Sequence, residues 1–238
     1  MPSKGMIVTF SGLDGAGKST QIELLLDELR RQGRRPVYLW TRGGYTGLFE
    51  ALKRVLRKAP GQVMPSSGSN RERATAFGRP LVRKIWLAVA LLDLMRIYGL
   101  QLRWWRWRGH AVVCDRYLWD TLIDFRLNFP SEQVERWWLW RALAWVAPRP
   151  RAAFLLLVPV EESLRRSDIK GEPFRDSAEV LAQRLVAYQR LNGTIYWHVL
   201  DGRRAKSDLA AEIIGAIDLA DGLALDSVRT DRELGAQE

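Results

Sequence analysis

Short apolar runs alternate with longer amphipathic stretches along this chain, and the alternation predicts its elements. Five runs are rich in β-branched or aliphatic residues and have the length of buried strands. They cover residues 6–11, 36–40, 110–114, 152–158 and 196–200. The stretches between them repeat apolar residues at helical spacing, which predicts helices. These helices cover residues 21–31, 48–56, 81–108, 120–127, 133–146, 178–190 and 207–220, and a further helix starts over 161–166.

Strands that alternate with helices are typical of a parallel sheet with helices on both faces. The predicted fold class is therefore α/β, with three layers built around a five-stranded parallel sheet. No internal repeat is present, so one domain over residues 1–220 with a flexible tail over 221–238 is the simpler interpretation. Residues 59–80 and 167–176 are predicted loops, and loops of such length inside a domain make them candidate lids.

Composition narrows the class of protein. The chain has 238 residues and a single cysteine, Cys114, so it has no intramolecular disulfide and fits a reducing compartment. Its longest uninterrupted apolar run near a helix, residues 85–92, ends at Asp93 and is too short to span a bilayer. The N-terminal stretch lacks the pattern of a signal peptide. We expect a soluble, cytoplasmic protein.

Charge points to anionic partners. The net charge is +10, and residues 221–238 contribute −3, so the preceding residues carry +13. Such a surface favours nucleotides, nucleic acids, phosphorylated substrates or anionic membranes.

A glycine-rich segment after the first strand matches the phosphate-binding pattern G-x-x-x-x-G-K-[ST] at every fixed position. In such a loop, backbone N–H groups turn inward on a phosphate, and the following helix adds its positive N-terminal end. Lys18 is expected to reach the β- and γ-phosphates of ATP, and the Ser19 hydroxyl to bind Mg²⁺. The predicted nucleotide-binding residues are Gly12, Leu13, Asp14, Gly15, Ala16, Gly17, Lys18, Ser19 and Thr20.

The third predicted strand ends in an acidic and a basic residue, Asp115 and Arg116. The carboxyl ends of parallel strands face the ligand crevice of a sheet. We therefore expect Asp115 to hold Mg²⁺ through water and Arg116 to bind the phosphate that is modified. The alternative is a surface pair without a role in chemistry.

These segments resemble the thymidylate kinase family, whose fold is that of the P-loop nucleoside monophosphate kinases. The resemblance spans residues 6–217 and is strongest over residues 7–21 and at Asp115-Arg116-Tyr117. It implies an ATP-dependent kinase that passes the γ-phosphate in line to a phosphate oxygen of an acceptor. This chemistry depends on positioning and charge neutralisation rather than on acid–base catalysis.

The resemblance also implies roles for single residues. Asp14 would contact a sugar hydroxyl of the acceptor, and Arg42 and Arg116 would contact its phosphate. The family's arginine-bearing lid resembles residues 165–176, for which a solvated charged loop is the alternative, and residues 201–203 resemble its adenine loop. The residues implied in catalysis are Lys18, Arg42, Arg116, Arg165, Arg166 and Arg175.

The base pocket departs from the family's pattern. The family carries Phe-x-x-Asp-Arg on a long helix, where the Phe stacks on thymine and the Arg binds base and phosphate. Here Ala90 replaces the Phe and Leu94 the Arg, while Asp93 is kept and Arg96 lies one turn further on. Asp124 stands where the family has a base-facing Tyr. We therefore expect an altered acceptor, bound by Asp14, Arg42, Asp93, Arg96, Arg116 and Thr121.

Two segments combine tryptophan with arginine. Residues 103–108 read RWWRWR and residues 136–141 read RWWLWR. Such segments stack on nucleic-acid bases, lie in membrane interfaces, or pack in a core. Trp138 and Trp145 share one helical face, which favours a core or subunit contact, and a homodimer is thus an open alternative. The three tryptophans of the first segment cannot share one face, so at least one is expected to be exposed.

The sequence thus predicts a Mg-ATP-dependent kinase that acts on a nucleoside monophosphate or a similar phosphorylated acceptor. Two alternatives stay open. The first is a kinase of a non-nucleotide, sugar- or lipid-linked acceptor on the same frame. The second is a nucleotide-binding regulator that contacts nucleic acid or membrane and transfers no phosphate.

Overall fold

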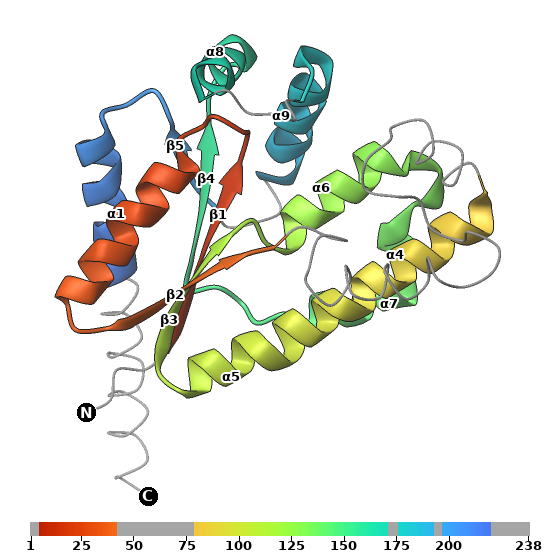
Figure 1. Cartoon of the computed structure of the whole chain (residues 1–238), viewed down its shortest axis with the longest axis horizontal. Helices are drawn as coiled ribbons and strands as arrows, with labels where there is room; N and C mark the ends of the chain where they lie inside the picture. The colour runs from red at the N-terminus through yellow and green to blue at the C-terminus, as the bar shows by residue number, and fades with distance from the viewer. Residues whose placement is uncertain (1–4, 42–78, 171–175, 193–196, 220–238) are drawn as a thin grey trace, which may run out of the picture. The chain divides into compact units, whose positions relative to one another are not determined.

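A computed structural model of the chain describes residues 5–41, 79–170, 176–192 and 197–219 (Figure 1). By its internal contacts the chain divides into two compact units. Unit 1 consists of residues 1–39, 106–115 and 149–238, and unit 2 of residues 40–105 and 116–148. The sheet belongs to unit 1, whereas the described part of unit 2 is mainly helical.

The sheet has five strands in the order β2-β3-β1-β4-β5. The strands are β1 (Met6–Gly12), β2 (Arg35–Trp40), β3 (His110–Asp115), β4 (Ala152–Leu157) and β5 (His198–Asp201). β1 pairs in parallel with β3 and β4, and β4 with β5. The three central strands are buried along nearly their whole length, which explains why they read as continuous apolar runs. All five predicted strands are confirmed within two residues at each end.

Four described helices belong to unit 1. They are α1 (Lys18–Arg31), α8 (Val160–Lys170), α9 (Ala178–Asn192) and a helix over residues 206–219. α1 and the 206–219 helix lie side by side in Figure 1, and the Gln21 amide donates a 3.1 Å hydrogen bond to the Lys206 carbonyl. The predicted three-layer α/β fold of the P-loop kinases is confirmed.

Unit 2 is organised around one long helical stretch. It consists of α4 (Pro80–Met95), the π-helical turn η1 (Arg96–Gln101) and α5 (Leu102–Trp107), whose last two residues count with unit 1. The other elements are α6 (Leu118–Asn128), the 3₁₀ turns η2 (Pro130–Glu132) and η3 (Val134–Arg136), and α7 (Trp138–Val146). α4 packs on α7, and the Trp86 ring centroid lies 5.4 Å from Phe129 and 6.2 Å from Phe125. Aromatic contacts therefore form much of this core.

The helix predicted over residues 133–146 is shorter than expected. Gln133 has a left-handed backbone with φ of 43°, and Trp137 is extended with φ of −73° and ψ of 141°. Neither conformation continues an α-helix, and two 3₁₀ turns precede α7 instead. The prediction was wrong before Trp138, because apolar spacing does not report backbone conformation.

The charged loop predicted from residue 167 starts later, because α8 continues to Lys170. Glu162 forms ion pairs with Arg165 and Arg166 at helical spacings of three and four residues, which support the helix. The loop prediction was wrong for residues 167–170. Several other predictions lie outside the described residues, wholly or mostly: Arg42, Arg175, the helix over 48–56, the loop over 59–80 and the tail over 221–238.

One helical stretch among the described residues, Pro80–Trp107, is long and apolar enough to cross a membrane by length and composition. From the sequence we expected no membrane-spanning helix, because no uninterrupted apolar run is long enough. An 18-residue window that tolerates a few polar residues nevertheless reaches a mean hydropathy of 1.5 in this stretch. Half of that window is buried, and α4 packs on α7. We therefore interpret this stretch as a core helix of a folded domain.

Three of the six tryptophans in the two Trp-Arg segments are exposed, and so is Trp145, which follows the second segment. The exposed fractions are 50% for Trp104, 77% for Trp107, 73% for Trp138 and 84% for Trp145. Exposure in the first segment is confirmed. Of the two alternatives for the face of Trp138 and Trp145, the core contact is wrong, because α7 buries its opposite face, formed by Leu139, Trp140 and Leu143. A subunit contact at that face stays a prediction.

Candidate active site

The phosphate-binding loop of unit 1 joins β1 to α1. A Cβ on Gly12 would lie 2.0 Å from the Leu156 carbonyl oxygen, so β4 leaves room for glycine only. Gly17 precedes α1 with a left-handed φ of 97°, a conformation that disfavours other residues. α1 then begins at Lys18, so the N–H groups of its first turn lie at the end of the loop. That position suits a bound phosphate.

The Lys18 side chain folds back over the loop and is buried. Its ammonium donates hydrogen bonds to the carbonyls of Leu13 at 2.7 Å and Gly12 at 3.1 Å, and lies 3.9 Å from the Asp14 carboxylate. The loop therefore holds a positive charge at a fixed place. A fixed ammonium of this kind favours a polyanionic phosphate chain.

Asp115 ends β3, and its partner across the sheet is Phe10, close to the start of the phosphate loop. The carboxylate is buried. Its Oδ2 accepts a 3.1 Å hydrogen bond from the Tyr38 hydroxyl, while Oδ1 has no hydrogen-bond partner among the described residues. Burial, together with the Asp115 charge, raises the pKa of Tyr38 to about 12, so the phenol keeps its proton and donates. Asp115 thus presents one buried oxygen to a further ligand.

The donor set suits a magnesium ion that arrives with a nucleotide. Among the described residues, no cluster of three His, Cys, Asp or Glu side chains could hold a metal by itself. Mg²⁺ in kinase sites takes only one or two protein oxygens and completes its shell with phosphate and water. Asp115 Oδ1 and the exposed Ser19 hydroxyl meet that requirement.

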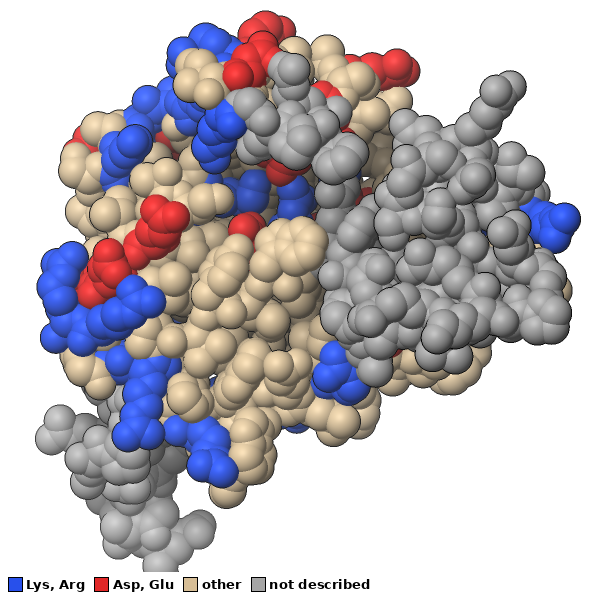
Figure 2. All heavy atoms as spheres, in the orientation of Figure 1, with Lys and Arg blue, Asp and Glu red and all other residues tan. Residues whose placement is uncertain are grey.

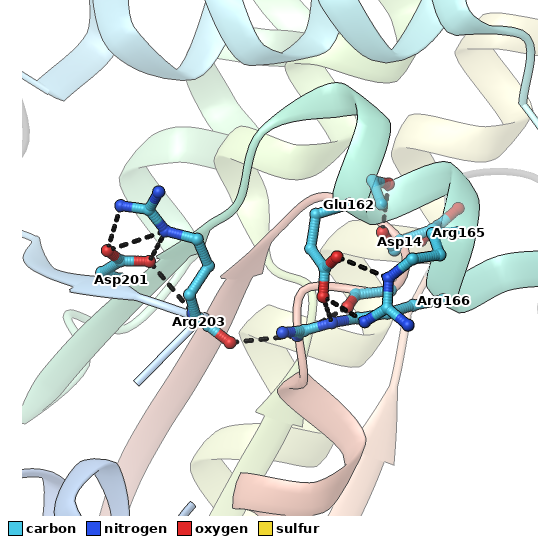
Figure 3. A network of polar contacts seen from close by, with 9 residues as sticks. Asp14, Glu162, Arg165, Arg166, Asp201 and Arg203 are labelled. Carbon is cyan, nitrogen blue, oxygen red and sulfur yellow. Dashed lines mark hydrogen bonds and ion pairs between the residues drawn. The ribbon is translucent and has the colours of Figure 1, made fainter. Parts of the chain in front are cut away.

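α8 contacts the phosphate loop through two side chains (Figure 3). The Ser163 hydroxyl donates a 2.5 Å hydrogen bond to the Asp14 carbonyl, and Arg166 Nη1 donates one of 3.3 Å to the Gly15 carbonyl. The backbone of the loop is therefore supported from a helix that starts more than 140 residues later in the chain.

Glu162 binds the two predicted lid arginines of α8, Arg165 and Arg166. Its carboxylate accepts hydrogen bonds from Arg165 and Arg166, and these bonds lower the pKa of Glu162 to about 2. Arg166 contacts the phosphate loop itself, whereas Arg165 is exposed and bonded to Glu162.

The loop after β5 lies against the phosphate loop. A Cβ on Gly202 would lie 2.4 Å from the Ala16 carbonyl oxygen, and Arg166 Nη1 also donates a 3.0 Å hydrogen bond to the Gly202 carbonyl. Asp201 accepts hydrogen bonds from the Arg203 side chain at both carboxylate oxygens, which lowers the pKa of Asp201 to about 2 (Figure 3). The loop that the resemblance assigns to adenine is therefore joined to the phosphate loop by Arg166.

Tyr38→Phe tests whether this hydroxyl orients Asp115. We expect about a tenfold rise in the Mg²⁺ concentration needed for half-maximal turnover, because groups that orient a metal ligand typically contribute 10–100-fold to affinity. The KM for ATP at saturating Mg²⁺ should stay near wild type. Since the pKa of Tyr38 is about 12, no activity step between pH 6 and 9 should depend on this residue. An unchanged Mg²⁺ titration would contradict the role.

Arg116 belongs to unit 2 and has a left-handed φ of 71° with a buried side chain. Its carbonyl accepts a 3.1 Å hydrogen bond from the Thr41 hydroxyl. Because that hydroxyl has a single proton, Tyr98 must be the donor in its 2.9 Å hydrogen bond with Thr41. A non-glycine residue in this conformation costs at least about 1 kcal/mol and persists only where its surroundings fix it.

The support behind Arg116 is aromatic. The Tyr98 ring lies 4.5 Å from the Tyr117 ring, and the Tyr117 hydroxyl donates a 2.8 Å hydrogen bond to the Pro148 carbonyl. Tyr98 lies in the π-helical turn η1, and such turns are frequent at functional sites. The backbone of Arg116 is therefore held in place by side chains from separate parts of unit 2.

Of the other acceptor residues predicted in unit 2, Asp93 and Arg96 contact each other, whereas Thr121 makes a separate hydrogen bond. Asp93 and Arg96 form an ion pair with an Oδ1–Nε distance of 2.9 Å, in which the carboxylate is buried and the guanidinium partly exposed. Thr121 is buried and donates to the Tyr117 carbonyl at 3.3 Å. Asp93 and Arg96 thus form one unit, whereas the Thr121 hydroxyl is used within α6.

The two positions that replace base-binding residues of the family, Ala90 and Leu94, are both buried. Trp86, the aromatic residue one turn earlier, packs against Phe125 and Phe129. This part of α4 therefore contributes apolar core.

The phosphate loop with its buried lysine, the aspartate at the end of the neighbouring strand and the parallel sheet define a P-loop kinase.

No family model matches the chain. The chain is similar to thymidylate kinases from several organisms. It is 40% identical over 184 residues to that of Bradyrhizobium sp. (strain ORS 278), covering 75% of this chain and 72% of the relative. It is 30% identical over 173 residues to that of Alkalilimnicola ehrlichii, with 71% and 70% covered, and 27% identical over 234 residues to that of Bartonella henselae, with 94% and 99% covered.

The chain therefore belongs to the thymidylate kinase family, and it is an ATP-dependent kinase.

Four of the five site residues that were not predicted from the sequence are Tyr38, Thr41, Tyr98 and Ser163. Each acts through a contact with a residue far away in the chain, which no local pattern reveals. Glu162 was the one missed residue with a readable pattern, because it precedes two arginines at helical spacing.

Proposed function

We propose that this protein transfers the γ-phosphate of Mg-ATP to the phosphate of a nucleoside monophosphate. The observation that carries the proposal is the phosphate loop, in which the buried Lys18 ammonium lies over the loop and Asp115 ends the neighbouring strand. A phosphate acceptor is already an anionic nucleophile, so positioning and charge neutralisation suffice.

The donor is held in unit 1. The loop N–H groups and Lys18 bind the phosphate chain of ATP, and the loop after β5 borders the base. Mg²⁺, bound through Ser19 and Asp115, would neutralise charge on the β- and γ-phosphates. Arg166 keeps the two loops together through its hydrogen bonds to Gly15 and Gly202.

The acceptor phosphate is gripped by Arg116, whose backbone is fixed by Thr41. Arg96, paired with Asp93 and partly exposed, is a second cation of unit 2 available for the acceptor. Arg42, Arg165 and Arg175 are proposed to add positive charge around the transferred phosphate, as the resemblance implies. Together they would neutralise the charge that accumulates between the two substrates.

Arg116→Ala should raise the KM for the acceptor and lower kcat, with ATP affinity little changed. Losing a charged hydrogen bond to a phosphate typically costs about 1.5–3 kcal/mol, so kcat/KM should fall about 10- to 100-fold. Arg126→Ala, which removes an exposed arginine of α6, is the matched control and should behave as wild type. Loss of ATP binding with intact acceptor binding would mean that Arg116 serves the other substrate.

A kinase of a non-nucleotide phosphate acceptor is the second candidate. The observation that favours it is the burial of Ala90 and Leu94 where the family has base-binding side chains. A sugar phosphate or lipid-linked phosphate would need the same phosphate grip without a base pocket.

An ADP-release assay separates these candidates. Mg-ATP is supplied at saturation, and the acceptors are the common ribo- and deoxyribonucleoside monophosphates and a panel of sugar phosphates. The proposal expects ADP formation to depend on one or a few nucleotides. Dependence on a sugar phosphate alone supports the second candidate, and ADP formation that no acceptor stimulates contradicts both candidates.

A further inference from the structure

Helix α8 of unit 1 has one exposed, charged side and one buried side. Glu161, Arg165 and Asp168 are exposed, and Figure 2 shows basic and acidic side chains next to each other over this helix. The buried side carries two serines one turn apart, Ser163 and Ser167. Of these two hydroxyls, only that of Ser163 donates a hydrogen bond to another part of the described structure.

The buried side of α8 packs directly on the phosphate loop (Figure 3). The Ser163 hydroxyl donates its hydrogen bond to the Asp14 carbonyl, and Arg166 Nη1 donates one to the Gly15 carbonyl. A Cβ on Gly15 would lie 2.8 Å from the Ser163 carbonyl oxygen, so only glycine fits beneath the helix. Two successive peptide carbonyls of the loop are thus held by α8.

The direction of these carbonyls determines where the loop amides point. The C=O and N–H groups of a trans peptide point in opposite directions. Because the Asp14 carbonyl faces α8, the Gly15 N–H faces away from that helix. The Ala16 N–H donates a 3.2 Å hydrogen bond to the Leu13 carbonyl, whereas the Gly15 N–H has no acceptor among the described residues. The Gly15 N–H is therefore available to a bound phosphate, which such loops bind through their backbone N–H groups.

The backbone of Gly15 does not fix this orientation by itself. Gly15 has a φ of 73°, and glycine adopts positive and negative φ about equally readily. The Asp14–Gly15 peptide can therefore turn over at little steric cost from Gly15. The turned peptide would direct the Asp14 carbonyl oxygen toward the phosphate, and both groups are negatively polarised. The hydrogen bond from Ser163 opposes this rotation.

We propose that Ser163 is a positioning residue of the ATP site, which holds the Gly15 N–H in the direction that binds a phosphate. Ser163 lies behind the loop and acts through the loop backbone. Arg166 supports the next peptide, and Glu162 holds Arg166 in turn by accepting a hydrogen bond from its Nε. The inference rests on the proposed use of this loop for the phosphates of ATP, and it is independent of the acceptor.

Binding of Mg-ADP without an acceptor tests this role by calorimetry. Ser163→Ala should raise the Kd of Mg-ADP about tenfold, because only the fraction of molecules with an inward Gly15 N–H binds the nucleotide fully. The KM for ATP should rise by a similar factor and kcat should change little, as expected for a contact made equally before and during transfer.

Two further variants separate the hydrogen bond from packing. Ser167→Ala is the matched control, because it removes a buried hydroxyl from the same side of α8 that has no hydrogen bond to the phosphate loop. It should bind Mg-ADP as wild type. Ser163→Cys keeps the site filled but offers only a weak donor, so its Kd should rise as that of Ser163→Ala does.

The amide signal of Gly15 reports the orientation of the peptide directly. Labelling aspartate with ¹³C at the carbonyl and glycine with ¹⁵N selects glycine amides that follow aspartate, and the chain has three: Gly15, Gly202 and Gly222. In the nucleotide-free protein, Ser163→Ala should shift or broaden the Gly15 signal and leave the Gly202 signal in place. Saturating Mg-ADP should restore the wild-type Gly15 signal, because the nucleotide selects the inward orientation.

Wild-type affinity of Ser163→Ala or Ser163→Cys for Mg-ADP overturns the proposal, and so does an equal loss in Ser167→Ala. An unchanged Gly15 signal in Ser163→Ala, or a Gly202 signal displaced as far as that of Gly15, also overturns it. A wild-type protein that binds no Mg-ADP contradicts both this role and the proposed function. Equal binding of Mg-ADP by wild type and Ser163→Ala contradicts this role alone.

Discussion

Lys18→Ala is expected to lower kcat about 10²- to 10³-fold. Lys18 is the only side-chain ammonium that the described structure places over the phosphate loop, where it is buried and bonded to the Leu13 and Gly12 carbonyls. Loss of one preorganised donor at developing phosphate charge typically has an effect of this size. Steady-state kinetics at saturating acceptor and Mg²⁺ measure it.

The fold should survive this substitution. Two hydrogen bonds to loop carbonyls are lost, at about 1 kcal/mol each, so Tm should drop by no more than about 8 °C. Arg31→Ala, which removes an exposed cation from the last turn of the same helix, is the matched control and should keep wild-type kinetics. Near-wild-type turnover of Lys18→Ala would mean that the phosphate loop is not the catalytic site.

Thymidine monophosphate is expected to be a poor acceptor, with kcat/KM about two to four decades lower than that of the preferred nucleotide. In the family an aromatic ring stacks on thymine and an arginine binds the base, and the corresponding Ala90 and Leu94 are buried apolar residues here. Lost base stacking costs about 1–3 kcal/mol and a lost charged hydrogen bond a comparable amount. Trp86 does not restore the stacking, since its ring is buried and packs against Phe125 and Phe129.

The measurement compares kcat/KM for all nucleoside monophosphates at saturating Mg-ATP. A value for dTMP above about 10⁴ M⁻¹s⁻¹, and well above the other nucleotides, would overturn this prediction. It would assign the base contacts to other residues, such as Arg96 or the half-buried Trp119, and leave the proposed phosphoryl transfer intact.

The parts of the fold that local sequence determines were predictable. The central strands are buried on both faces and are therefore apolar along their length, which made them recognisable. The phosphate loop was recognisable from its glycines at fixed spacing. The bonds that support the site were not predictable in this way. Ser163 reaches Asp14 across 149 residues and Tyr38 reaches Asp115 across 77, and such pairings exist only once the sheet is assembled.

Two errors have a common physical cause. The helix before Trp138 and the inward face of Trp138 and Trp145 were both inferred from apolar spacing, which assumes that large apolar residues face a core. The left-handed backbone of Gln133 interrupts the predicted helix, and the exposure of Trp138 and Trp145 contradicts the predicted core contact. An apolar face that remains exposed in a charged setting is better interpreted as a surface for a partner.

The most direct test of the central claim follows the transferred phosphate. The protein is incubated with Mg-ATP labelled at the γ-phosphate and with each nucleoside monophosphate, and the products are separated by chromatography. The account predicts that the label appears in the β-position of a nucleoside diphosphate, in amounts equal to the ADP formed, and that Lys18→Ala and Arg116→Ala both reduce it. Label found only in inorganic phosphate, or in no product at all with every nucleotide, would contradict the assignment of this protein as a nucleoside monophosphate kinase.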